Sequence, residues 1–277
     1  MRGSIRWKPR LLVTDPRGAV AVLEIGRLCK DFGAHRAVAD VSFTLVAGRS
    51  LAIVGESGSG KTTVARMIVG LERPTSGTIS ACGHDRSRPA TTTRERRRRA
   101  REVQVVFQDP YTSLDPRQTI RGMLSEVVST HDPEGGSDRV ERLLELVGLD
   151  RRQAESLPRG LSGGQRQRAT IARALAAAPR VMILDESVAA LDVSIQAQIL
   201  NLLMDIRDET GVSYVLISHA LAVVRQLTDD MIVMRHGQVI ESGATGDVLD
   251  APTHEYTRLL RDSVPRRGWK PTRKDPA

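Results

Sequence analysis

The sequence predicts an α/β fold in which a parallel β-sheet is covered by helices on both faces. Short, mainly apolar stretches at 51–54, 181–184 and 213–218 (SYVLIS) predict buried strands, and stretches with helical periodicity lie between them. Strands that alternate with helices in this way form parallel sheets, because a parallel pair needs a long crossover connection. Ligands of such sheets bind beyond the carboxyl ends of the strands. The residues that follow each apolar run are therefore the first candidates for a functional site.

Composition and cysteine content limit the class of protein. At 277 residues the chain is long enough for one large domain or two smaller ones. No apolar run approaches the ~20 residues that span a bilayer, and the short run Ala19–Val22 is followed by Glu24, unlike a secretory signal peptide. Two cysteines, Cys29 and Cys82, provide neither a disulfide framework nor a metal-ligand cluster. These features favour a cytoplasmic protein.

The net charge of +8 raises the question of an anionic partner. The densest basic run, RERRRRAR at 94–101, has no interleaved aromatic residues on which bases would stack. It precedes a strand candidate in a polar stretch, where a solvated helix face is expected. We therefore expect residues 94–101 to form an exposed helix face. Contact with anionic lipid or a membrane protein is the alternative, and nucleic acid is the least favoured partner.

Turn residues and periodicity place the other elements. Residues 1–21 are basic and rich in turn formers, and are expected to be a flexible extension. Two strand-like stretches follow between Val22 and Val46, and a further short strand, TISAC, follows the Ser76–Gly77 turn. The remaining expected elements are a strand at 102–107, helical periodicity over 118–157 with breaks at 135–136 and 148, helices at 161–178 and 194–207, and a hairpin around His236–Gly237.

Residues 51–63, LAIVGESGSGKTT, combine a buried strand, a glycine-rich turn and a helix. Gly55, Gly60, Lys61 and Thr62 fit the G-x-x-x-x-G-K-[ST] pattern of a P-loop. The glycines let successive N–H groups face an anion, the lysine supplies charge to the outer phosphates of a nucleotide, and the threonine hydroxyl ligates Mg²⁺. The expected nucleotide contacts are Gly55, Glu56, Ser57, Gly58, Ser59, Gly60, Lys61, Thr62 and Thr63.

Polar side chains follow three other apolar strands. Asp185 is expected to hold Mg²⁺, and the adjacent Glu186 to orient or deprotonate the attacking water. Helix N-capping by either acid is the alternative. Gln108 would reach Mg²⁺ and water, and His219 would contact the γ-phosphate. Because these side chains and the P-loop all lie just past strand ends, we expect one shared site.

A second anion-binding surface is predicted at 161–168, LSGGQRQR. The glycines open a helix, so that Ser162 and the amides of Gly163 and Gly164 face outward at its N-terminus. One nucleotide does not need two phosphate cradles in the same chain. The economical explanation is a dimer in which this surface closes over the ATP held by the P-loop of the partner.

With these motifs, residues 22–262 resemble the ATP-binding subunits of ABC transporters. The family's order is present: the P-loop GESGSGKT, the glutamine loop at Gln108, the signature LSGGQ, the Walker B strand VMILDE, the D-loop AALD and the switch histidine His219. The resemblance implies an ABC domain at 22–264 with a P-loop (RecA-like) core, an N-terminal antiparallel β subdomain and an inserted helical subdomain at about 110–178, followed by a basic tail at 265–277. It adds Gln165 to the ATP contacts and implies that Phe32 in KDFG stacks on adenine, with a core phenylalanine as the alternative.

Three stretches are similar to the peptide/nickel importer branch: VQVVFQDPYTSLDPRQTI, LAVV, and THEYTRLLRDSVP. The resemblance implies that two such ATPases, identical or paralogous, pair beneath two integral-membrane permeases at the cytoplasmic face of the membrane. The segment after Gln108 would meet the permease, and an extracytoplasmic protein would deliver the peptide or nickel. The alternative is a soluble ABC ATPase that acts on nucleic acid or in enzyme-complex assembly, as in the carbon–phosphorus lyase type.

The sequence departs from the family at four positions. Ser187 replaces the usual proline, Ala189 a common serine, Ala220 the usual aspartate, and Leu157 a common aromatic residue. None of these changes removes a phosphate-contacting group. We therefore expect them to affect D-loop communication and turnover rather than ATP binding.

Overall fold

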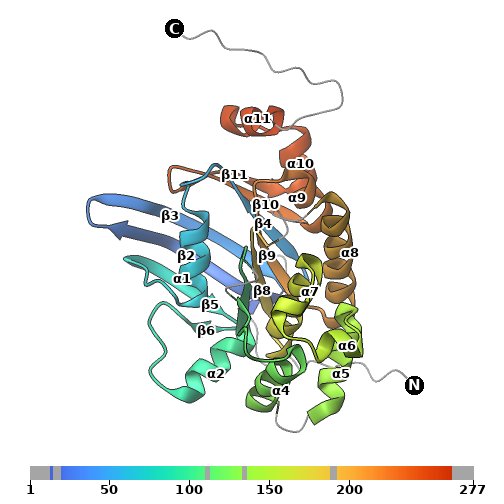
Figure 1. Ribbon diagram of the computed structural model, residues 1–277. Helices are drawn as coiled ribbons and strands as arrows, with labels where there is room; N and C mark the ends of the chain where they lie inside the picture. Colours follow the sequence, from blue (N-terminus) through green and yellow to red (C-terminus); the bar gives the residue numbers. More distant parts are fainter. Residues whose placement is uncertain (1–12, 15–19, 110–112, 133–135, 188–191, 264–277) are drawn as a thin grey trace.

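The computed structural model describes residues 13–14, 20–109, 113–132, 136–187 and 192–263, and contains two β-sheets with helices packed around them (Figure 1). The expected basic tail at 265–277 lies outside the described residues, as does most of the N-terminal extension. In the described part of the chain no helix is long and apolar enough to cross a membrane.

The first sheet is antiparallel and comes from the N-terminal part of the chain. Its strands are β1 (Val13–Thr14), β2 (Val20–Phe32), β3 (His35–Val46), β5 (Ser76–Ala81) and β6 (His84–Asp85). β2 pairs with β1 and β5 along one edge and with β3 along the other, and β5 pairs with β6. The two predicted strands between Val22 and Val46 are therefore confirmed, and the first begins at Val20.

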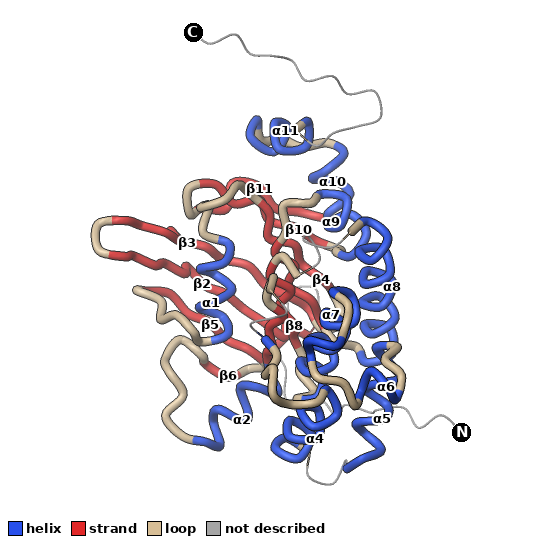
Figure 2. Tube along the Cα trace, viewed as in Figure 1, coloured by secondary structure: helices blue, strands red, loops and turns tan. Residues whose placement is uncertain are grey.

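The second sheet is parallel except for one edge strand, as Figure 2 shows at the centre of the molecule. Its strands are β4 (Ser50–Val54), β7 (Val103–Val106), β8 (Val181–Asp185), β9 (Ser213–Ile217), β10 (Asp230–Arg235) and β11 (Gln238–Ala244). Their order is β11-β10-β4-β9-β8-β7, and β11 pairs with β10 in antiparallel fashion. The predicted α/β fold is confirmed, and so is the hairpin, whose residues His236 and Gly237 have φ values of +48° and +77°.

The parallel sheet separates two apolar cores. Side chains such as Ile53, Ile183 and Ile217 pack toward α1 (Lys61–Val69) and the antiparallel sheet. Their neighbours along the strands, among them Leu184 and Leu216, pack among helices on the other face. Successive side chains of a strand point to opposite faces, so a strand buried on both faces must be apolar throughout. This is the physical reason for the continuous apolar runs.

The remaining helices are α2 (Thr93–Glu102), α4 (Ile120–His131), α5 (Gly136–Val147), α6 (Arg151–Ala154), α7 (Gly163–Ala176), α8 (Val193–Thr210), α9 (Leu221–Leu227), α10 (Thr245–Asp250) and α11 (Glu255–Asp262), with a short 3-10 helix at Pro158–Gly160. Helices α4, α5 and α7 pack on one another. They fall within the predicted helical subdomain at about 110–178, whose first residues, 110–112, lie outside the described part.

The arginine run forms α2, and most of its side chains are exposed, as expected. Within the run Arg99 differs from the expectation because it is buried, and Glu102, which follows the run, is buried as well. Arg99 donates to the Glu95 carboxylate and to the Arg88 carbonyl. Glu102, expected at the start of a strand, instead ends α2 and lies beside Arg86 from the loop after β6. The helix is therefore anchored through buried charge as well as solvated.

Candidate nucleotide-binding site

The four predicted site segments lie at one edge of the parallel sheet. β4, β9, β8 and β7 are neighbours and parallel, so their carboxyl ends meet there. The P-loop follows β4, His219 lies two residues past β9, Asp185 ends β8, and Gln108 lies two residues past β7. The shared edge agrees with the sequence-based expectation.

The P-loop leaves β4 at Gly55 and enters α1 at Lys61. Gly55 has a φ of +149°, and a Cβ there would lie 2.2 Å from the carbonyl oxygen of Met234 in β10. Gly60 has a φ of +100°, and its Cβ would lie 2.5 Å from the Ala37 carbonyl oxygen. Both positions therefore require glycine, for conformation and for close packing. The loop is held between β10 and the antiparallel sheet.

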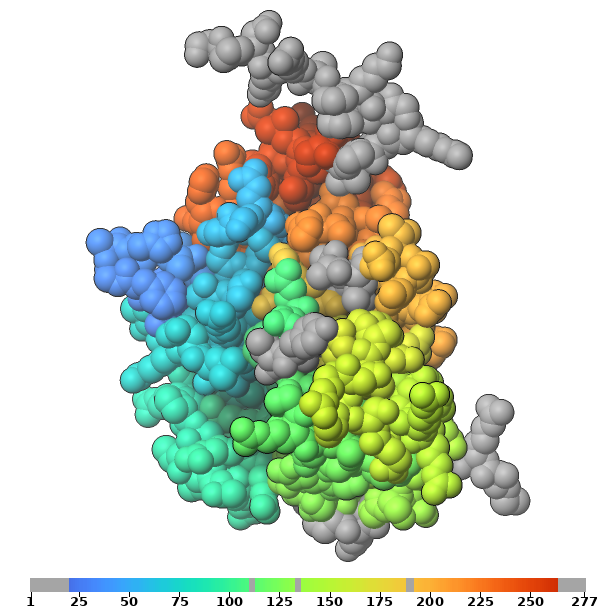
Figure 3. Space-filling view, viewed as in Figure 1, coloured from blue at the N-terminus to red at the C-terminus, as the bar shows by residue number. Residues whose placement is uncertain are grey.

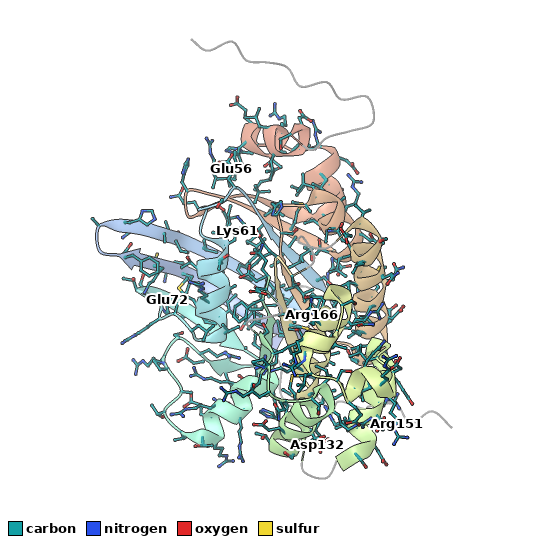
Figure 4. All side chains as sticks on the ribbon, viewed as in Figure 1. Glu56, Lys61, Glu72, Asp132, Arg151 and Arg166 are labelled. Carbon is teal, nitrogen blue, oxygen red and sulfur yellow. The ribbon has the colours of Figure 1, made fainter. Side chains whose placement is uncertain are left out.

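The Lys61 ammonium folds back over the P-loop. It donates to the carbonyl oxygens of Gly55 and Glu56, at 2.8 and 2.6 Å, and approaches the Ser59 hydroxyl at 3.2 Å. Burial lowers the pKa of Lys61, and the nearby carboxylates of Glu186 and Asp185 oppose that shift. Figure 4 shows Lys61 at the start of α1, with Glu56 beyond it. An ammonium held over the loop in this way is placed to contact a phosphate group bound there.

Thr62 and Asp185 provide oxygen atoms suited to Mg²⁺. The Thr62 hydroxyl lies 3.5 Å from the Asp185 carboxylate. Burial raises the pKa of Asp185, and the negative charge of Glu186 raises it further by a smaller amount. A carboxylate in that environment gains from a nearby cation. Among the described residues there is no group of three or more His, Cys, Asp or Glu side chains that could hold a metal ion.

Glu186 and His219 form the other polar pair of the site. The His219 Nδ1 lies 3.3 Å from a Glu186 carboxylate oxygen. Glu186 has a φ of +47°, which is strained for a non-glycine residue, and its N–H donates to the Ile217 carbonyl of the neighbouring strand. Strained backbone held by surrounding structure is common at functional sites. The two side chains remain partly exposed, so a ligand can reach them.

Gln108 and Phe32 are exposed. Gln108 follows β7 and is exposed. In Figure 3 a green part of the chain reaches the surface between the cyan and the yellow-green parts. Phe32 ends β2 with 48% of its surface exposed, and the Lys30 ammonium lies 4.7 Å from its ring centre. The alternative of a core phenylalanine is therefore wrong. An exposed ring next to a cation is available for stacking on a ligand, and the adenine role stays a prediction.

The signature residues begin α7. Ser162 is the N-cap: its hydroxyl accepts from the Gln165 N–H, and the Gln165 side chain accepts from the Ser162 N–H. Gly163 and Gly164 are the first two helical residues, whose amides have no acceptor inside a helix. Ser162, Gly164 and Gln165 line a cavity of about 300 Å³ together with Gly148, Gln153, Arg168, Ile195 and Gln198.

The chain does not bring this surface to its own P-loop. No P-loop residue lines the cavity at the start of α7. Figure 4 shows Arg166 of α7 well apart from Lys61. Of the predicted D-loop, residues 189–191 lie outside the described part, whereas Asp192 is the N-cap of α8. The structure therefore separates two groups of predicted site residues: the strand-end cluster and the start of α7.

Sequence reasoning missed one contact of the P-loop. The Glu56 N–H donates to the hydroxyl of Tyr256 in α11, at 3.0 Å. The contact joins positions 200 residues apart, and the sequence carries no local signal for it.

The sheet, the P-loop and the residues at the strand ends define a P-loop nucleotide-binding protein. The chain belongs to the ABC transporter family, whose model matches residues 38–189. Among its relatives, the oligopeptide transport ATP-binding protein OppD of Mycobacterium bovis is 46% identical over 265 residues, which cover 95% of this chain and 42% of the relative. The dipeptide transport ATP-binding protein DppF of Haemophilus influenzae is 44% identical over 83% of this chain and 71% of the relative. The chain thus spans less than half the length of the OppD relative.

Solved structures of ABC proteins have the same fold. The cbiO1 protein of Clostridium perfringens, part of an ABC transporter complex, matches 90% of this chain and 97% of its own with a TM-score of 0.75 and 26% identity. A dimeric post-hydrolysis state of the ATP-binding cassette MJ0796, bound to ADP and phosphate, matches 80% of this chain and 98% of its own, with a TM-score of 0.70 and 26% identity. The resemblance stated from the sequence motifs is confirmed.

Proposed function

We propose that this chain is the ATP-hydrolysing, energy-coupling subunit of an ABC importer for di- or oligopeptides, or for a related solute such as nickel. The observation that carries the proposal is the convergence of Lys61, Thr62, Asp185, Glu186 and His219 at one sheet edge. The names of the peptide-transport relatives support the solute class.

ATP would lie between two subunits, identical or paralogous. The P-loop of one subunit would hold the phosphates, and Ser162, Gly163, Gly164 and Gln165 of the other would close over them. Two observations support this arrangement: the start of α7 is remote from the P-loop of its own chain, and the related MJ0796 cassette with ADP and phosphate is dimeric. Contacts supplied in trans are worth ~10³–10⁵ in rate in related phosphoryl transfers.

Each strand-end residue has one task in this proposal. Lys61 binds the outer phosphates, while Thr62 and Asp185, with Gln108, would hold Mg²⁺. The metal would neutralise charge on the phosphate oxygens. Glu186 orients or deprotonates the attacking water, and His219, 3.3 Å from it, contacts the γ-phosphate. Phe32 stacks on the adenine.

The partners would be two integral-membrane permeases, contacted through the chain after Gln108 at the cytoplasmic face of the membrane. An extracytoplasmic solute-binding protein would act on the permeases and only indirectly on this subunit. The relatives' names as transport and peptide import proteins support this placement over a soluble ABC ATPase.

Complementation tests the shared site. A Lys61→Ala subunit lacks a working P-loop, and a Ser162→Arg subunit lacks a working signature. In a mixed dimer one site carries both defects and the other carries none. Each variant alone should be inactive, and an equal mixture should recover up to about a quarter of wild-type ATPase activity. No recovery would contradict a site completed by two copies of this chain.

Affinity purification tests the transport assignment. Tagged Glu186→Gln protein would be purified from native membranes in the presence of ATP, with Lys61→Ala as the control. Two multi-span permeases, with or without a second ATPase, would support the importer. Recovery of soluble enzymes or nucleic acid alone would refute it and leave the ATPase chemistry intact.

A further inference from the structure

The C-terminal helix contacts the nucleotide loop through one buried hydroxyl. Tyr256 in α11 is 3% exposed, and its hydroxyl accepts a hydrogen bond from the Glu56 N–H at 3.0 Å. Burial raises the pKa of this phenol, so it is neutral at physiological pH. The predicted role of the P-loop residues does not account for the contact.

The tyrosine is fixed from several directions. The Glu241 carboxylate in β11 accepts from the N–H and hydroxyl of Thr253, at 2.7 and 2.8 Å, and from the His254 N–H at 3.2 Å. His254 in turn caps α11 by accepting from the Tyr256 N–H at 3.0 Å. The Arg235 guanidinium lies 4.8 Å from the centre of the tyrosine ring. The hydroxyl is therefore presented by a well-anchored segment.

The neighbouring turn holds the same loop. The Gly237 N–H donates to the Ser59 carbonyl at 3.1 Å, and Gly55 packs directly against the Met234 carbonyl. β10, the turn after it and α11 thus contact the outer side of the P-loop. In Figure 1 these C-terminal elements lie next to the loop that leads into α1.

The geometry of one peptide group links Tyr256 to the catalytic lysine. The Gly55 carbonyl and the Glu56 N–H belong to the same planar trans peptide, so they point in opposite directions. The N–H donates to Tyr256, and the carbonyl accepts from the Lys61 ammonium at 2.8 Å. Fixing the N–H outward therefore fixes the carbonyl inward, toward the lysine. Rotation of this peptide would disturb both contacts together.

We infer that Tyr256 is a positioning residue for nucleotide binding, which holds the Gly55–Glu56 peptide in the orientation that sets Lys61 in the phosphate site. This inference rests on the proposed function only in that the ligand is ATP. In this inference the C-terminal helix α11 supports the P-loop from outside the loop. Tyr256 is buried and contacts the loop through its hydroxyl, so we expect its loss to weaken ATP affinity more than it slows the chemical step.

Two tyrosine-to-phenylalanine variants provide the test. Tyr256→Phe removes the hydroxyl and keeps the ring beside Arg235. Tyr214→Phe is the matched control, because its fully buried hydroxyl donates to the Leu203 carbonyl in α8 at 2.8 Å and not to the P-loop. Both variants lose one buried hydrogen bond. They differ in whether that bond reaches the P-loop.

Binding of a fluorescent ATP analogue and steady-state ATPase kinetics should separate the two variants. Tyr256→Phe should weaken binding by roughly three- to tenfold, the scale of one hydrogen bond, and raise KM with kcat nearly unchanged. Amide hydrogen exchange at Glu56 should also be faster. Tyr214→Phe should lower the Tm and leave binding, KM and exchange at Glu56 unchanged.

The outcomes are distinct from those of the proposed function. Wild-type protein that binds no ATP would refute the proposed function. Tyr256→Phe protein that binds ATP as wild type does, with unchanged exchange at Glu56, would overturn the inference alone. Equal loss of affinity in both variants would also overturn it, because the effect would then come from general destabilisation.

Discussion

Replacing Glu102 by glutamine removes the negative charge from a buried cluster that joins α2 to the antiparallel sheet. The Glu102 carboxylate lies 2.9 Å from His84 Nδ1, 3.2 Å from Arg98 Nε and 3.5 Å from Arg86 Nη1. The Arg86 side chain is 2% exposed. Burial lowers the pKa of Arg86 to about 10, although the Glu102 charge opposes the shift. The Glu102 carboxylate thus supplies a negative charge that compensates the buried Arg86 guanidinium.

The expected loss of stability follows from which properties of glutamate the glutamine side chain keeps and which it lacks. Its size is nearly that of glutamate, so packing changes little, and the loss is mainly electrostatic. Removing one partner of a buried ion pair costs about 3–5 kcal/mol, against about 0–1 kcal/mol for an exposed pair. Arg86 retains its hydrogen bond to the Arg99 carbonyl at 3.2 Å. We therefore expect the free energy of unfolding to fall by about 3 kcal/mol, the lower end of the buried range.

Urea unfolding followed by circular dichroism measures this difference. Glu141→Gln is the matched control, because Glu141 pairs with Arg121 at the surface, with its side chain 55% exposed. The control should lose no more than about 1 kcal/mol. If Glu102→Gln were as stable as that control, the buried cluster would not anchor α2 and the reasoning would be wrong.

Three further predictions concern the site and the thiols. Lys61→Ala should reduce the rate of ATP hydrolysis by at least about 10²-fold, the scale of one charge-stabilising donor. Phosphate release at the wild-type rate would show that Lys61 does not act in the site. Glu186→Gln should retain ATP binding and slow hydrolysis by about 10²–10⁴-fold. An ATP-bound dimer should then accumulate, which size-exclusion chromatography would detect. Hydrolysis at the wild-type rate would exclude Glu186 as the base. Burial raises the pKa of Cys82 to about 11, so at pH 8 its thiolate is scarce. In a Cys29→Ser background, iodoacetamide should label Cys82 about 200-fold more slowly than an ordinary thiol of pKa ≈ 8.5, and the rate should rise about tenfold per pH unit up to pH ~10; labelling that is already fast at pH 8 would contradict the shift.

The parallel sheet was predictable because its signal is local. Residues 181–184 and 214–217 form continuous, mainly apolar runs, since both faces of each strand are covered. The exceptions arise where distant groups decide burial. A run of arginines predicts an exposed helix face. Nothing near Arg99 or Glu102 in the sequence indicates that Arg86 will lie beside them.

The site was predictable to the same degree. The rule that ligands bind at strand carboxyl ends brings Asp185, His219 and Gln108 to one edge without any knowledge of side-chain contacts. It does not reveal the left-handed backbone of Glu186, which its hydrogen bond to β9 holds in place. Nor does it reveal Tyr256, because a phenol that accepts from an amide 200 residues away has no sequence pattern.

Two of the departures from the family pattern, Ser187 and Ala220, adjoin Glu186 and His219 and do not lie in the P-loop. Ser187, next to Glu186, is 3% exposed, and its hydroxyl finds no hydrogen-bond partner among the described residues. Ala220, next to His219, is the N-cap of α9 and offers no side-chain acceptor, where an aspartate would cap the helix. Among the described residues, neither side chain makes a hydrogen bond that would support the neighbouring Glu186 or His219. Because the P-loop contacts of Lys61 involve neither residue, we expect the two changes to alter the orientation of Glu186 and His219, and so the rate of hydrolysis and not the affinity for ATP.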